Sequence, residues 1–189
     1  MVIGSAGTVS TGAIDPLREI SDVCKKYNLW FHVDGAYGGF AAMLDDVPED
    51  LKQLVLADSI AVDPHKWLYA PIEAGCVLVK DRKALHDTFS FSVPYYRFEG
   101  SGSEPPTNYF EYGPQNSRGF RALKVWLAIR QVGLNGYRKM LSDDCSLARE
   151  LFKEVQKYPD LQAMTCVLSI ATFRYVPKNQ ETSEKYLND

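Results

Sequence analysis

The amino-acid sequence predicts an α/β fold built around a largely parallel β-sheet. Two observations support this fold class. Over the first 80 residues, segments with the pattern of buried strands alternate with helical segments, in the order strand, helix, strand, helix, strand, strand. The run LWFHVD, at 29–34, is almost continuously apolar, as expected for a parallel strand that is covered on both faces.

The first strand is predicted at 2–5, and a helix follows it. Asp15 has the residue type of a helix N-cap, and Pro16 suits the first helical position. Asn28 is expected to end this helix. Its apolar positions recur with helical spacing, at Leu17, Ile20, Val23 and Cys24.

After the strand at 29–34 comes a glycine-rich loop, and then a short helix that starts at Pro48. Further apolar runs predict strands at 58–63 and 75–80. The last of these follows a short connection, so an antiparallel direction remains open to it.

The second half differs from the first in composition and in periodicity. Residues 90–116 are rich in Tyr, Gly, Ser and Pro without a helical period, which predicts a mobile functional loop. A helix is predicted at 117–133 and ends at Gly133, and a longer one runs from 134 to 158. The two strands at 161–176 predict a smaller α+β unit. The buried stripe of the longer helix is expected at Tyr137, Met140, Leu141, Leu147, Leu151 and Val155.

Composition excludes several classes of protein. A net charge of −3 gives no basic footprint for nucleic acid, and no apolar run is long enough to predict a membrane span. The four cysteines show neither CxxC pairing nor metal-ligand spacing with the three histidines, which predicts reduced thiols in a cytoplasmic protein without a metal site. The N-terminus does not resemble a signal peptide. A chain that starts in a strand and ends in an unfinished helix is expected to be part of a larger protein.

Two residues carry the predicted chemistry. Asp34 and Lys66 each follow a buried strand, and ligands of parallel α/β sheets gather at the carboxyl ends of the strands. Taken singly, Asp34 is explained as a loop cap and Lys66 as a lysine that covers Trp67. A buried lysine can also attack a carbonyl, and a carboxylate can keep a pyridine nitrogen protonated. Together they match what pyridoxal phosphate requires.

These residues lie in motifs with a family resemblance. FHVDGAYGG (31–39) and DPHKWL (63–68), at this separation, resemble the group II pyridoxal-phosphate-dependent amino-acid decarboxylases, and Trp67 favours the aromatic-type branch over the glutamate branch. AGTVSTGAIDPL (6–17) and SRGFRALKVWLAIRQVG (117–133) resemble further parts of the same family. The resemblance implies a fold-type I enzyme, with 1–123 as the second part of the large cofactor-binding domain, and with a linking helix and an incomplete small domain at 124–189.

The resemblance also implies roles for individual residues. Lys66 would carry pyridoxal 5'-phosphate covalently, Asp34 would pair with its pyridine nitrogen, and Ala36 would lie against its ring. His65 would lie near the phosphate, and Thr8 would remain available to the cofactor although Val9 departs from the family pattern. Relatives often carry Asn where this chain has Asp63, and no phosphate role is carried over to Asp63.

A tyrosine of the predicted loop would return a proton to the substrate carbon, and Tyr95 stands at the matching distance from Lys66, with Tyr96 beside it. The implied activity is decarboxylation of an L-amino acid, of the aromatic class, by a homodimer. Another fold-type I lyase, an aldehyde synthase, an aminotransferase and an inactive truncated form remain alternatives. The 189 residues alone lack half of the family's cofactor pocket, so poor turnover is expected of them.

Overall fold

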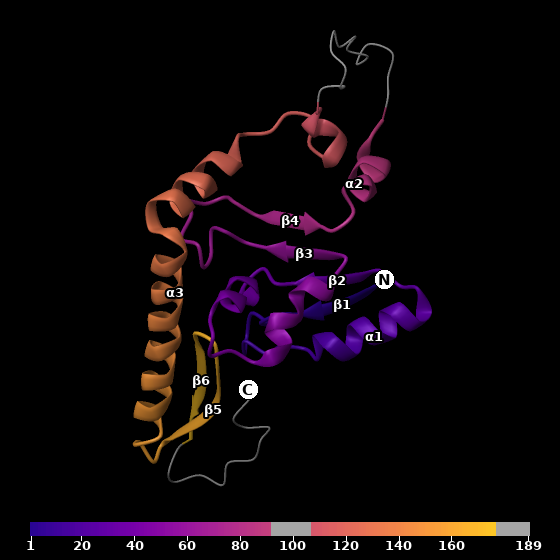
Figure 1. Ribbon diagram of the computed structural model, residues 1–189. Coiled ribbons are helices and arrows are strands. Elements are labelled where there is room, and N and C mark those ends of the chain that lie inside the picture. The colour runs from indigo at the N-terminus through magenta and orange to yellow at the C-terminus, as the bar shows by residue number, and fades with distance from the viewer. Residues whose placement is uncertain (92–106, 177–189) are drawn as a thin grey trace.

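The computed structural model describes residues 1–91 and 107–176 (Figure 1). Its main sheet has four strands in the order β1-β2-β3-β4, of which the first three are parallel and the last pair is antiparallel. The α/β prediction is therefore confirmed, and the open direction of the fourth strand is settled as antiparallel. The strands are β1 (Val2–Ser5), β2 (Phe31–Asp34), β3 (Ser59–Val62) and β4 (Cys76–Val79).

Helices and a hairpin surround this sheet. Figure 1 shows α3 running along one side of the molecule, with the antiparallel hairpin of β5 and β6 beside its C-terminal half. The remaining elements are α1 (Leu17–Tyr27), the 3₁₀ helices η1 (Gly38–Met43), η2 (Glu49–Leu56) and η4 (Tyr109–Tyr112), α2 (Arg82–Phe89), α3 (Arg121–Val155), β5 (Leu161–Val167) and β6 (Ile170–Tyr175).

The hydrophobic core joins the sheet to the helices. Phe31 and Val33 of β2 are buried against Leu17 of α1, and Leu51 of η2 and Leu141 of α3 belong to the same apolar cluster. Each of these side chains is at most 1% exposed, so the cluster supplies the hydrophobic stabilisation of the fold.

The start of α1 corrects one prediction. Asp15 does not cap the helix, because its Oδ2 accepts the backbone N–H of Ser5 at 2.7 Å and thereby ties the helix entry to the end of β1. Pro16 occupies the cap position without a side-chain hydrogen bond, whereas Asn28 closes the helix in the left-handed conformation, as predicted. Val23 is 49% exposed and does not belong to the buried face.

The structure confirms two helices on either side of Gly133, and the label α3 covers both of them with the break between. Gly133 has φ 70° and ψ 168°, values outside the helical region that glycine adopts at low cost. The buried stripe is narrower than predicted, because Leu147 and Leu151 are exposed and line an open cleft instead of the core.

The region between β4 and α3 also differs from the prediction. The sequence analysis missed α2, which begins after Asp81, whose Oδ1 accepts the N–H of Lys83 at 2.9 Å. The predicted loop at 90–116 contains the short helix η4, so its described part is not irregular throughout. Among the residues that the structure describes, no helix is both long enough and apolar enough to cross a membrane.

The core position of Leu141 yields a stability prediction. Leu141→Ala removes fully buried methyl groups and leaves a cavity, so the free energy of unfolding should fall by about 2–5 kcal/mol in urea titrations. Leu147→Ala on the same helix is the matched control, and as a 63% exposed position it should change stability by no more than about 0.5 kcal/mol. Equal losses in the two variants would contradict the observed orientation of α3.

Candidate functional site

Parallel pairing brings the ends of three strands to one edge of the sheet. Ser5 of β1 lies opposite Asp34 of β2, and Asp34 lies opposite Ala61 of β3. The segments that leave these strands contain Thr8, Asp34 and Lys66. The predicted cofactor-binding residues therefore share the carboxyl edge of the sheet, where α/β proteins bind ligands.

The lysine segment forms a tight turn after β3. The N–H of Lys66 donates to the carbonyl of Asp63 at 2.9 Å, and the next two residues, Trp67 and Leu68, are buried. The hydroxyl of Tyr137 on α3 donates to the Leu68 carbonyl at 2.8 Å, which fixes the segment against the long helix. The buried neighbours thus anchor the turn while Lys66 projects from it.

The prediction that Lys66 is buried is wrong for this structure. Its side chain is 41% exposed, and its ammonium group lies 2.8 Å from Oδ2 of Asp63. Nζ therefore lies against a carboxylate and open to solvent, so burial of the side chain does not explain the chemistry expected of Lys66.

His65 faces the same carboxylate. Its Nδ1 accepts the backbone N–H of Ala74 at 3.2 Å, which assigns the ring proton to Nε2 when the imidazole is neutral. Nε2 lies 3.9 Å from Oδ2 of Asp63, beyond hydrogen-bond length but close enough for attraction. Asp63, whose role the sequence left open, is thus the residue that joins Lys66 and His65.

Asp34 is exposed at the end of β2, and one of its oxygens is already used. Oδ1 accepts the N–H of Ala36 at 3.0 Å, a local bond that orients the carboxylate. In residues 1–91 and 107–176, Oδ2 has no hydrogen-bond partner. A carboxylate with one oriented and one open oxygen fits a protonated pyridine nitrogen.

Thr8 has a structural task in the loop after β1. Its Oγ1 accepts the N–H of Ala13 at 3.0 Å and lies 3.1 Å from the hydroxyl of Thr11. Gly7 precedes it with φ 94°, which favours glycine at this turn. Thr8 therefore closes its own loop at the edge of the sheet.

A cleft of about 730 Å³ opens beside Lys66. Its other walls come from Tyr37 before η1, from α3 and from the β5–β6 hairpin. The hydroxyl of Tyr37 lies 2.6 Å from Oγ of Ser169, so the hairpin is tied to the sheet edge there. Burial raises the pKa of Tyr37. Of the predicted site residues that the structure describes, Lys66 alone lines the cleft. The lining is Tyr37, Lys66, Trp67, Tyr69, Asp144, Leu147, Ala148, Leu151, Ser169, Ile170 and Ala171.

Tyr69 and Asp144 form a link across this cleft that the sequence analysis missed. The phenol donates to Oδ2 of Asp144 at 2.6 Å, and this hydrogen bond, followed by burial, raises the pKa of Tyr69 to about 12. The two residues are 75 positions apart in the chain, so only the docking of α3 brings them together.

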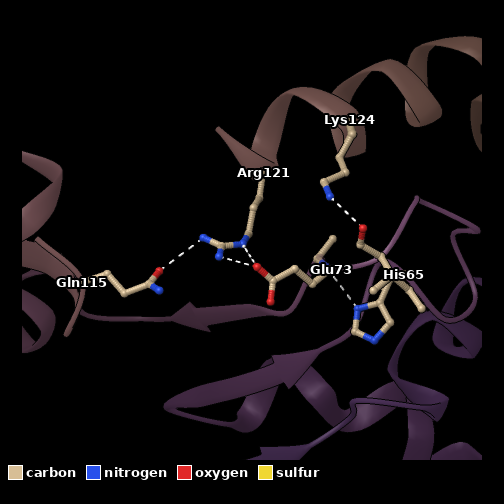
Figure 2. A network of polar contacts seen from close by, with 7 residues as sticks. His65, Glu73, Gln115, Arg121 and Lys124 are labelled. Carbon is tan, nitrogen blue, oxygen red and sulfur yellow. Dashed lines mark hydrogen bonds and ion pairs between the residues drawn. The ribbon is translucent and has the colours of Figure 1, made fainter. Parts of the chain in front are cut away.

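A second polar network braces the segment that follows the lysine turn. Figure 2 shows Arg121 between Glu73 and Gln115, and Lys124 donating to the carbonyl of Ile72 at 3.2 Å. The hydrogen bond from Arg121 lowers the pKa of Glu73. Because Glu73 adjoins the N–H that His65 accepts, the start of α3 helps to hold the histidine ring.

Tyr95, the predicted proton donor, lies outside the described residues, as does its neighbour Tyr96. Its role stays a prediction that the geometry of the site does not test.

Comparisons with known proteins agree on one family. A family model described as the pyridoxal-dependent decarboxylase conserved domain matches residues 1–175. The chain is 36% identical to an aromatic-L-amino-acid decarboxylase of Bacillus atrophaeus over 97% of this chain and 38% of that protein. It is 32% identical to tyrosine decarboxylase 2 of Arabidopsis thaliana, over 93% of this chain and 32% of that protein.

Solved structures show the same relationship. The structure of Oryza sativa TDC with PLP and tryptamine has a TM-score of 0.89 at 25% identity, over 98% of this chain and 39% of that one. Mouse CSAD in apo form has a TM-score of 0.84 at 29% identity, over 98% and 39% of the two chains. The chain thus spans less than two fifths of the length of these relatives.

The link between Tyr69 and Asp144 yields a titration prediction. Asp144→Asn removes the carboxylate acceptor, so the pKa of Tyr69 should fall from about 12 towards the ordinary value of about 10. Tyrosinate absorbance during alkaline titration measures this, with Tyr69→Phe subtracted in each background to isolate the one residue. Asp143→Asn is the matched control, since Asp143 pairs with Lys139 instead. An unchanged Tyr69 titration in Asp144→Asn would refute the hydrogen bond.

Proposed function

The chain belongs to the pyridoxal-dependent decarboxylase family, and from this membership we propose that the protein it forms part of decarboxylates an L-amino acid to the amine and CO₂ with pyridoxal 5'-phosphate. The single observation that carries this is the presence of Lys66 and Asp34 at one carboxyl edge of a parallel sheet, in a chain that matches the family over 1–175. When bound, the cofactor supplies an electron sink for the bond that breaks.

The residues at this edge fit the cofactor in chemical type. Lys66 is the amine that would hold its aldehyde carbon, and the open oxygen of Asp34 is the acceptor that would hold its ring nitrogen protonated. Ala36, small enough to admit a flat ring, would lie against it. His65 would lie near the phosphate, where its ring N–H is a suitable donor, and Thr8 would remain available to the cofactor.

Proton return is the task we propose for Tyr95. Its phenol would donate a proton to the substrate carbon after CO₂ has left. Within the chain, we propose that 1–123 belongs to the cofactor-binding domain and that 124–189 contributes the linking helix and a small domain.

An aromatic amino acid is the proposed substrate class. The relatives described as aromatic-L-amino-acid and tyrosine decarboxylases support it. A specific observation also favours a second candidate, an aldehyde synthase, because a 3,4-dihydroxyphenylacetaldehyde synthase of Aedes aegypti is 30% identical over the whole of this chain.

We also propose a cytoplasmic homodimer. Exposed apolar side chains at the start of α3 support an assembly that covers them, among them Phe120 just before the helix and Trp126 and Leu127 on it. The four cysteines are all free, which is consistent with a reducing compartment.

Substitution of the two site residues tests the proposed activity in the full-length protein. Lys66→Ala should reduce CO₂ release to background, and borohydride should no longer fix the cofactor to the chain. Asp34→Asn should keep the attachment but lower kcat by roughly 10- to 150-fold, the equivalent of one charge-assisted hydrogen bond.

Asp22→Asn, at an exposed position on α1, is the control and should keep full turnover. Product analysis separates the two candidates, since a decarboxylase yields the amine and an aldehyde synthase yields a carbonyl compound. Full activity in Lys66→Ala would refute the proposed function.

A further inference from the structure

The carboxylate of Asp63 takes no part in the chemistry proposed above, although it makes the closest contact to Lys66. We infer that Asp63 is a positioning residue that holds the Nζ of Lys66 in an ion pair at the edge of the sheet and thereby limits how fast this lysine attacks a carbonyl compound. The identification of that compound as pyridoxal phosphate rests on the proposed function; the restraint on Lys66 does not.

The local backbone sets the pair. The turn that closes with the N–H of Lys66 on the carbonyl of Asp63 brings the two side chains to one side, three residues apart. Nζ and Oδ2 lie 2.8 Å apart, a charge-assisted contact. The side chain of Asp63 is 22% exposed, so solvent screens this pair less than it screens an ion pair at the open surface.

His65 also approaches this carboxylate, at the same oxygen as Lys66. Nε2 of His65 lies 3.9 Å from Oδ2 of Asp63. Nδ1 of the same ring accepts the N–H of Ala74, so Nδ1 cannot become a donor unless that hydrogen bond is lost. Arg121 braces the preceding residue, Glu73, as Figure 2 shows. Asp63 therefore faces one full positive charge in this turn, that of Lys66.

The chemical consequence follows from the lone pair. An ammonium ion has none, so Lys66 must first release a proton to solvent, which its 41% exposure permits. The lone pair then forms the C–N bond, and the two remaining amine protons leave with the carbonyl oxygen as water. Asp63 opposes this sequence, because its ion pair with Nζ must break before the nitrogen can reach a carbonyl carbon.

Reductive methylation of the cofactor-free protein with formaldehyde and a borohydride reductant tests this directly. Peptide mass spectrometry then gives the rate of methylation at each lysine. Asp63→Asn keeps the shape of the side chain but removes its charge, so Lys66 should be methylated faster, on the order of three- to tenfold for a partly screened ion pair. The matched control is Asp143→Asn, which breaks the exposed 2.7 Å pair with Lys139 and should change methylation of Lys139 by less than about twofold.

A second measurement can be made on the unchanged protein. About 1 M NaCl shortens the screening length to about 3 Å and should accelerate methylation of Lys66 in the unchanged protein, but not in Asp63→Asn. Circular dichroism shows whether the variant is folded. If it is unfolded, the salt effect on Lys66 methylation in the unchanged protein decides the question. Methylation of Lys66 that is unchanged or slower in folded Asp63→Asn, or insensitive to salt in the unchanged protein, overturns the inference. Formaldehyde replaces pyridoxal phosphate in this assay, so its result is independent of whether the protein is a decarboxylase.

Discussion

Parallel pairing of β1, β2 and β3 is the constraint on which the rest of the site depends. In a parallel sheet every strand delivers its following segment to the same edge, so residues that are distant in the chain gather without any contact of their own. Asp34 and Ala61 are register partners, and the turn with Lys66 starts two residues after Ala61. A one-residue slip would turn every side chain of the strand to the opposite face, and burial of Phe31 and Val33 opposes such a slip.

The lysine turn depends on apolar anchors more than on polar ones. Trp67 and Leu68 are buried directly after Lys66, and the ring of Trp67 packs edge-on against Tyr37 at 4.8 Å between centroids. Tyr137 then binds the Leu68 carbonyl from α3. The exposed side chain of Lys66 is thus attached to a turn whose next residues are packed in the core. This suits a group that must react with a molecule from solvent.

Much of this arrangement could be predicted because its signals are local. The strand runs, the closing role of Asn28 and the break at Gly133 each depend on a few neighbouring residues, and the structure agrees with them. Asp15 misled the prediction because a residue suited to an N-cap can instead accept a bond from a neighbouring strand. The exposure of Lys66 was missed because its apolar neighbours make the whole stretch look buried.

The links made by Tyr37 with Ser169, and by Tyr69 with Asp144, had no sequence signal. They join residues 132 and 75 positions apart, and they depend on how the hairpin and α3 dock on the sheet. Their residue types are common at protein surfaces, so nothing in the composition singles them out. Such contacts follow from tertiary packing and cannot be obtained from periodicity.

Two carboxylates stand at the same edge of the sheet as Lys66, and chain connectivity decides which of them pairs with it. Asp63 is three residues from Lys66 in a closed turn, so its carboxylate lies within reach of the lysine nitrogen. Asp34 ends another strand and is oriented by its own bond to Ala36. In the described part of the chain the lysine thus makes its ion pair within its own turn, while the second oxygen of Asp34 remains open towards a ligand.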